Sequence, residues 1–322
     1  MKTYIARRML QGLIVLFIVS FIAFFIFQYL GDPVLTLAGR YATVEQREEV
    51  RSLLNLDQPF YIQYFSFISN AVRGNFGMSY VSRVPVARLI IERLPASIEL
   101  AVAAELFAVV VGISLGIFVA AKPSSLTSKF FMTGSLIGVS LPTFMVGILL
   151  ILLFSITINI LPPTGRGNLV NLFGRWRSGF FTLDGLKHLI MPALTLGMFQ
   201  MALLFRITRG AMLEVLGADF IRTARAKGLS SRIVLYKHAL RNALIPVITM
   251  IGLQFGQLIG FAIVTESIFQ WPGAGSLLLT SMYESDFPVL AAYIIMVAAI
   301  IVFLNVLVDI SYALLNPKIR YK

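Results

Sequence analysis

The sequence ADFIRTARAKGLSSRIVLYKHALR, which runs from Ala218 to Arg241, is the most basic stretch between two long apolar runs of this chain. Gly217 interrupts the apolar run before it. Asp219 is of a residue type that caps helix N-termini, and Gly228 is suited to end a helix in the left-handed conformation. The pattern therefore predicts a short helix of about eight residues, roughly 12 Å long at 1.5 Å per residue.

This short helix carries cations beside small and apolar positions, and a second helix capped by Ser230 or Ser231 follows it. The positions concerned are Phe220, Ile221, Arg222, Ala224, Arg225 and Lys227. A helix of this composition, held between two membrane spans, is suited to dock into a groove on a soluble partner. The alternative is a solvated basic loop that only fixes membrane topology, and composition alone favours that alternative.

The composition is that of a membrane protein. Of the 322 residues, 58% are hydrophobic and 13% are charged, and the mean hydropathy is +0.85. A soluble domain of this length could not bury so much apolar surface, which predicts a polytopic, all-α membrane protein. There is no cysteine, and the two histidines, His188 and His238, lie far apart, so the sequence indicates no metal site.

Six apolar segments are long enough to be membrane spans. The first belongs to an N-terminal unit of residues 1–30, and it is too long for a cleaved signal peptide. Residues 31–95 are polar and predict a small extracytoplasmic subdomain. The remaining part of the chain, 96–322, is predicted to hold five further spans at about 96–121, 130–160, 188–216, 243–265 and 289–315, with the basic loop at 217–242.

The basic residues follow the positive-inside rule if both termini are cytoplasmic. Sixteen Lys and Arg then lie on the cytoplasmic side and four on the outer side, once the long first loop is set aside. The net charge of +12 is therefore interpreted as a topology signal of a membrane protein with both termini in the cytoplasm. Nucleic acid is not predicted as a partner.

Two sets of residues inside the predicted spans are candidates for helix packing or for lining a path. Gly252, Gly256 and Gly260 form one narrow stripe that lets another helix approach closely. Gln254 and Gln257 lie on a different arc, and with Gln200 they are candidates to line a translocation path; structural hydrogen bonding is the alternative. Glu105 is a carboxylate within a span, and the sequence assigns it no role.

No catalytic machinery is visible. The chain has no Gly-x4-Gly-Lys-Ser/Thr loop for phosphate binding, no serine nucleophile motif and no paired catalytic carboxylates. It also lacks the several mid-membrane ionisable groups that ion-driven transporters use. The sequence therefore predicts a protein that is not itself an enzyme and holds no cofactor.

The stretch from Arg222 to Pro246, RTARAKGL…HALRNALIP, resembles the coupling loop of binding-protein-dependent ABC importer permeases. The family core is Glu-Ala-Ala, three residues, Gly, nine residues, Ile-x-Leu-Pro. Ala224, Gly228 and Leu240 fit that core, whereas its other positions depart from it as in the dipeptide, oligopeptide and nickel branch. GNFGMSY at 74–80 and FQWPGAGSLL at 269–278 resemble loops of the same branch.

The resemblance covers nearly the whole chain and is greatest to the first permease subunit of dipeptide and oligopeptide importers. It implies the type I importer permease fold, with six transmembrane helices, and alternating access driven by ATP. The implied ATPase-coupling residues are Asp219, Arg222, Thr223, Ala224, Arg225, Ala226, Lys227 and Gly228.

The resemblance also implies partners: a second, related permease subunit, two ATP-binding subunits that hold ATP and Mg, and an extracytoplasmic substrate-binding protein. Di- or oligopeptides are the expected substrates. Nickel complexes, glutathione and opines are the alternatives within the branch. A channel or secondary transporter that works without ATP is the alternative from a different class.

Overall fold

The structure is a computed structural model that describes residues 2–315, apart from 31–33, 35–37, 40–41, 54–55 and 175. The first half contains α1 (Lys2–Leu30), α3 (Val44–Leu53), α4 (Phe60–Val72), α5 (Val86–Ala121), α6 (Leu126–Ser140), α7 (Thr143–Leu150) and the π-helical segment η1 (Ile151–Thr157). After a two-stranded hairpin, β1 (Val170–Phe173) and β2 (Trp176–Ser178), come α8 (Leu183–Leu216), α9 (Asp219–Ala226) and α10 (Ser231–Ile233). The chain ends with η2 (Val234–Ala239), α11 (Leu240–Phe261), α12 (Ile263–Ile268), α13 (Ala274–Tyr283) and α14 (Phe287–Leu315).

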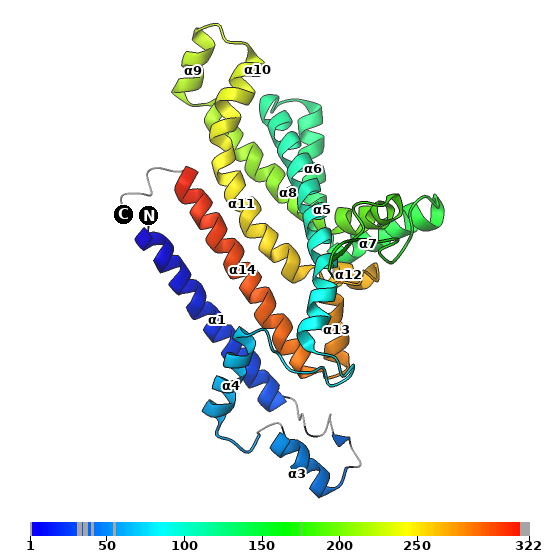
Figure 1. The fold of residues 1–322 in the computed structure, drawn as a ribbon. Helices are drawn as coiled ribbons and strands as arrows, with labels where there is room; N and C mark the ends of the chain where they lie inside the picture. Colours follow the sequence, from blue (N-terminus) through cyan, green and yellow to red (C-terminus); the bar gives the residue numbers. More distant parts are fainter. Residues whose placement is uncertain are drawn as a thin grey trace.

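Five described helices are long and apolar enough to cross a membrane. They cover Ile5–Ile26, Val86–Ala121, Leu183–Leu216, Ser231–Gly260 and Phe287–Ile310. Figure 1 shows α9 and α10 at one end of the bundle and α3 and α13 at the other. The predicted all-α membrane class is confirmed by this arrangement.

The structure corrects the single helix predicted over 130–160. That region is divided into α6, which ends at Ser140, and α7, which begins after Pro142. The reason is that proline has no N–H to donate and disfavours helical backbone at the residue before it, here Leu141. The remaining apolar helix, Thr143–Thr157, is shorter than the other spans and extends away from the bundle in Figure 1.

The other span boundaries also shift. The helix predicted to begin at 96 begins at Val86 and passes through Pro95, so part of the predicted outer subdomain is continuous with a span. The helix predicted to end at 265 is interrupted after Phe261 and resumes as α12. The first shift arises because polar residues near a span end do not by themselves stop a helix that tertiary packing supports.

The central contact of the bundle joins α5 and α8. A Cβ atom added at Gly112 would lie 2.8 Å from the Met201 carbonyl oxygen, and one added at Gly197 would lie 2.5 Å from the Ala104 carbonyl oxygen. Backbones this close require glycine, because any side chain would force the helices apart. This pair is joined by α11 around a core that includes Leu100, Ala104, Leu196 and Leu258.

The helix α14 packs between α1 and α11 (Figure 1). The structure places the predicted glycine stripe of α11 opposite α14. A Cβ at Gly256 would lie 3.5 Å from Ile301, one at Gly260 would lie 3.3 Å from Val297, and one at Gly252 would overlap Val308. The contact is therefore tightest at Gly252.

Candidate functional site

The short helix α9 lies at the end of the bundle, where it is attached through one face. The predicted length of eight residues is confirmed. Ile221 is 0% exposed and Ala224 is 7% exposed. They pack in one apolar cluster with residues of α5, α8, η2 and α11, which include Ile117, Ala120, Met212, Val234 and Ala243. A force on α9 would therefore be transmitted to the long helices through direct side-chain contact.

The two ends of α9 differ in how well the sequence predicted them. The left-handed conformation at Gly228 is confirmed, with φ at +75°, and its N–H donates to the Arg225 carbonyl at 2.9 Å. The predicted N-cap is corrected: the cap position is Ala218, and Asp219 is the first helical residue. In the first turn the carboxylate faces the positive end of the helix dipole, which is also favourable.

The remaining coupling residues predicted on α9 lie on its exposed side. Asp219 and Arg222 form an exposed ion pair at 3.3 Å, and the Thr223 hydroxyl donates to the Asp219 carbonyl at 3.0 Å. The other exposed residues of this surface are Phe220, Arg225, Ala226 and Lys227. The surface thus combines an aromatic ring with two arginines, and both residue types are enriched in protein–protein interfaces.

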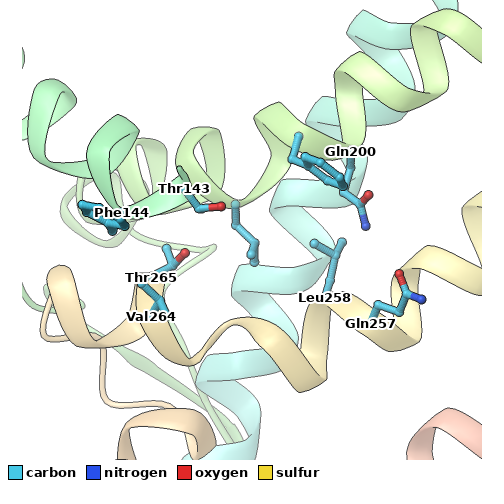
Figure 2. A pocket seen from close by; sticks show the side chains of 9 residues that line it. Thr143, Phe144, Gln200, Gln257, Leu258, Val264 and Thr265 are labelled. Carbon is cyan, nitrogen blue, oxygen red and sulfur yellow. The ribbon is translucent and has the colours of Figure 1, made fainter. Parts of the chain in front are cut away.

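A cavity of about 370 Å³ lies where α7, α8, α11 and α12 meet. Figure 2 shows Gln200 and Gln257 at one end of this cavity and Thr143 and Thr265 at the other. Apolar residues complete the lining: Phe144, Leu196, Phe199, Leu258 and Val264. The structure thus brings together two of the three predicted path residues from helices far apart in the sequence.

Gln254, the third predicted path residue, does not line this cavity. Its side chain is 2% exposed, and neither amide atom has a hydrogen-bond partner within the part of the chain that the structure describes. Sequence reasoning missed Thr143 and Thr265. Pro142 was a signal for Thr143, because a proline interrupts the helix and the next helix then begins with Thr143 at the interruption.

The segment that follows Thr265 in the sequence is held in place by a buried carboxylate. Glu266 is 0% exposed; the Ser97 hydroxyl donates to Oε1 at 2.5 Å and the Ser276 N–H donates to Oε2 at 2.8 Å. Burial raises the pKa of Glu266, while these hydrogen bonds act in the opposite direction. Trp271 Nε1 donates to the Ala96 carbonyl at 2.9 Å. The loop FQWPGAGSLL is therefore fixed to α5, a contact that the sequence did not reveal.

A buried ion pair lies near this loop. Arg166 Nη2 donates to Glu99 at 2.6 Å and to the Arg177 carbonyl at 2.8 Å. The Arg166 guanidinium also lies 5.8 Å from the centre of the Trp271 ring. Arg166 borders a polar cavity of about 360 Å³ that Glu92, Arg93, Leu169, Asn171, Gly174, Arg177 and Pro272 also line.

No group of three or more potential metal ligands occurs in the described ranges of the chain. A bundle of apolar helices, a cavity between four of them and a small basic helix at one end are the features of a membrane transport subunit. The chemistry available in the cavity is recognition by amide and hydroxyl groups.

Comparison with known proteins identifies the family. Residues 112–321 match the family model "Binding-protein-dependent transport system inner membrane component". Residues 1–101 match the model for the N-terminal part of the same membrane component. The chain therefore belongs to this family, and it is the permease subunit of an ABC importer, a multi-pass protein of the inner membrane.

Curated relatives match over the full length. The glutathione transport system permease protein GsiC of Escherichia coli (strain K12) is 42% identical over 323 residues, which is 100% of both chains. The GsiC protein of Shigella flexneri serotype 5b (strain 8401) matches to the same extent. A solved structure of the inward-facing MetNI methionine ABC transporter has a TM-score of 0.55. It covers 71% of this chain and 96% of that chain at 14% identity, and therefore supports the fold alone.

Proposed function

We propose that this permease moves small peptides, including glutathione-like tripeptides, into the cell. The observation that carries the proposal is the cavity lined by Gln200, Gln257, Thr143 and Thr265. Amide and hydroxyl groups donate and accept hydrogen bonds in the same way as a peptide backbone does. The full-length similarity to proteins named as glutathione permeases supports the same substrate class.

Nickel complexes are less well supported than peptides. A cavity for a metal complex would be expected to offer imidazole, thiolate or carboxylate groups, and the residues that line this cavity include none of them. Opines share carboxylate and amine groups with peptides, so the cavity lining does not separate them from peptides, and the test must include them.

Energy is proposed to reach this chain through contact. One of two ATP-binding subunits, which hold ATP and Mg, docks on the exposed surface of α9, and a second, related permease subunit completes the path. A binding protein delivers substrate from the outside. The chain alone hydrolyses no ATP. The attachment of Ile221 and Ala224 to the long helices supports α9 as the coupling element, and the bundle reorients by alternating access.

The test is uptake by proteoliposomes that contain the complete complex. We expect ATP-dependent uptake of labelled glutathione or dipeptides, and weaker competition by nickel or an opine. Gln257→Ala is expected to change the ratio of glutathione to dipeptide uptake without lowering subunit recovery. Leu253→Ala, an exposed position on the same helix, is the matched control. Uptake without ATP would contradict the importer mechanism, and an unchanged ratio in Gln257→Ala would contradict the assignment of the cavity.

A further inference from the structure

The helix α4 packs against the outer half of the first span rather than standing apart from it. Tyr64 is 4% exposed; its hydroxyl lies 3.0 Å from the Ser20 hydroxyl and donates to the Phe17 carbonyl at 3.2 Å. The Tyr64 ring lies 5.4 Å from that of Phe21 and 5.6 Å from that of Phe24. Figure 1 shows α4 beside the part of α1 that is farthest from α9.

These contacts fix the position of α4 along the candidate membrane span of α1. The span of α1 covers Ile5–Ile26. At 1.5 Å per residue, Ser20 lies about 9 Å inside the end of that span, and Phe17 about 13 Å inside it. One leaflet contributes roughly 15 Å of the hydrocarbon core. The Tyr64 side chain therefore reaches into the leaflet opposite α9.

The α4 backbone lies nearer the edge of that leaflet. The rings of Phe60 and Phe67, before and after Tyr64, lie 5.4 Å and 5.2 Å from Phe24. Phe24 is only about 3 Å inside the end of the span, on the same rise per residue. The helix thus crosses α1 where hydrocarbon meets the headgroups.

The rest of the α4 surface is divided into an apolar and a polar face. Tyr61, Phe65, Ile68 and Val72 follow one another at intervals of four, three and four residues, so they share one face. Tyr61 is 62% exposed, Phe65 65% and Val72 83%. The opposite side carries the polar residues Gln63, Ser66 and Asn70, and Arg73 follows at the C-terminal end of the helix.

We propose that α4 is an interfacial helix whose apolar face, formed by Tyr61, Phe65, Ile68 and Val72, is covered by acyl chains of the leaflet opposite α9. A helix with an apolar and a polar face lies in the membrane plane in this way, and tyrosine is enriched at this depth. The predicted extracytoplasmic segment 31–95 is then anchored to the membrane at its centre. This inference rests on membership of the membrane family and on the α1 contacts, and it does not depend on the substrate.

The absence of cysteine from the chain makes a direct test possible. An environment-sensitive fluorophore is attached at Phe65→Cys or, as a second variant, at Tyr61→Cys. The neighbouring Ser66→Cys on the polar face is the matched control. The labelled chain is placed in lipid nanodiscs, alone and with its partner subunits made free of reactive cysteine. Quenching is measured with doxyl-labelled lipid and with aqueous iodide, which reaches both faces of a nanodisc.

We expect doxyl lipid to quench the Phe65 and Tyr61 probes severalfold more than the Ser66 probe, and iodide to show the reverse order. Strong iodide quenching at Phe65 and Tyr61 would show a water-facing surface and would overturn the proposal. Shielding from both quenchers only in the assembled complex would show that a partner protein covers the face, which would also overturn it. Glutathione or peptide uptake can fail without affecting either readout.

Discussion

The Arg166 guanidinium meets the Glu99 carboxylate at 2.6 Å, although 67 residues separate them, and both side chains are almost completely buried. The pair joins α5 to the loop that leads into the β1–β2 hairpin. The Gly179 N–H also donates to Glu99, at 3.3 Å. Glu99 therefore connects three segments of the chain through one carboxylate.

Removal of one partner of this pair is expected to destabilise the fold. Arg166→Met leaves the Glu99 carboxylate buried without its cation, and such losses cost about 3–5 kcal/mol. We expect a clear fall in the thermal unfolding temperature of the purified chain. The double variant Arg166→Met with Glu99→Gln should recover part of that loss, because the uncompensated charge is gone. Equal stability of the single variant and the wild type would contradict the structural role of the pair.

Gly228 is predicted to tolerate asparagine best, alanine less well and valine least. Its φ of +75° is a left-handed conformation with open space around the Cα, so the cost comes from the backbone. That cost is roughly 1–2 kcal/mol for most residues, smaller for Asn and largest for a β-branched side chain. Uptake by the reconstituted complex should fall in the same order, with Gly228→Val losing transport while remaining inserted.

Gly210→Ala is the matched control for this series. A Cβ at Gly210 also meets nothing within 4 Å, but its backbone has no positive φ. Alanine should therefore be tolerated there, and uptake should stay near the wild-type level. If Gly228→Val transports normally with normal ATP turnover, α9 is not the coupling element. The basic stretch that contains it would then serve only to fix the membrane topology.

Gly252 is predicted to be the most sensitive glycine of the α11 stripe. A Cβ there would overlap the Val308 side chain, whereas a Cβ at Gly134 would meet nothing within 4 Å. Gly252→Ala should lower the thermal stability of the chain and Gly134→Ala should not. Adding Val308→Ala to Gly252→Ala should restore stability, because the smaller side chain opens the space. If the double variant is no more stable than Gly252→Ala, the close contact of Gly252 is not with Val308.

Topology is tested by labelling with a membrane-impermeant maleimide in intact cells. Ser52 and Ser230 are both exposed in the structure and no native cysteine competes. We expect Ser52→Cys to be labelled from outside and Ser230→Cys to be labelled only after the membrane is opened. This outcome would place α9 and both termini in the cytoplasm. Outside labelling of Ser230→Cys would reverse the orientation and exclude ATPase coupling through α9.

Local signals in the sequence were sufficient for several elements. The high apolar content required a membrane bundle, because each span must satisfy its own backbone hydrogen bonds in lipid. Asp219 and Gly228 delimited α9 to within one residue, since helix ends depend on a few neighbouring residues. The resemblance carried by the stretch from Arg222 to Pro246 pointed to the importer family that the comparisons then confirmed.

Only the tertiary structure decided which distant residues meet. Gln200 and Gln257 lie on different helices, and no local pattern shows that they share a cavity while Gln254 does not. The same holds for Glu266 with Ser97 and for Tyr64 with the first span, because their contacts depend on how helices pack and on the break at Pro142. Helix propensity and periodicity are set within a few turns of the chain, whereas packing is settled by complementary shapes across the whole bundle.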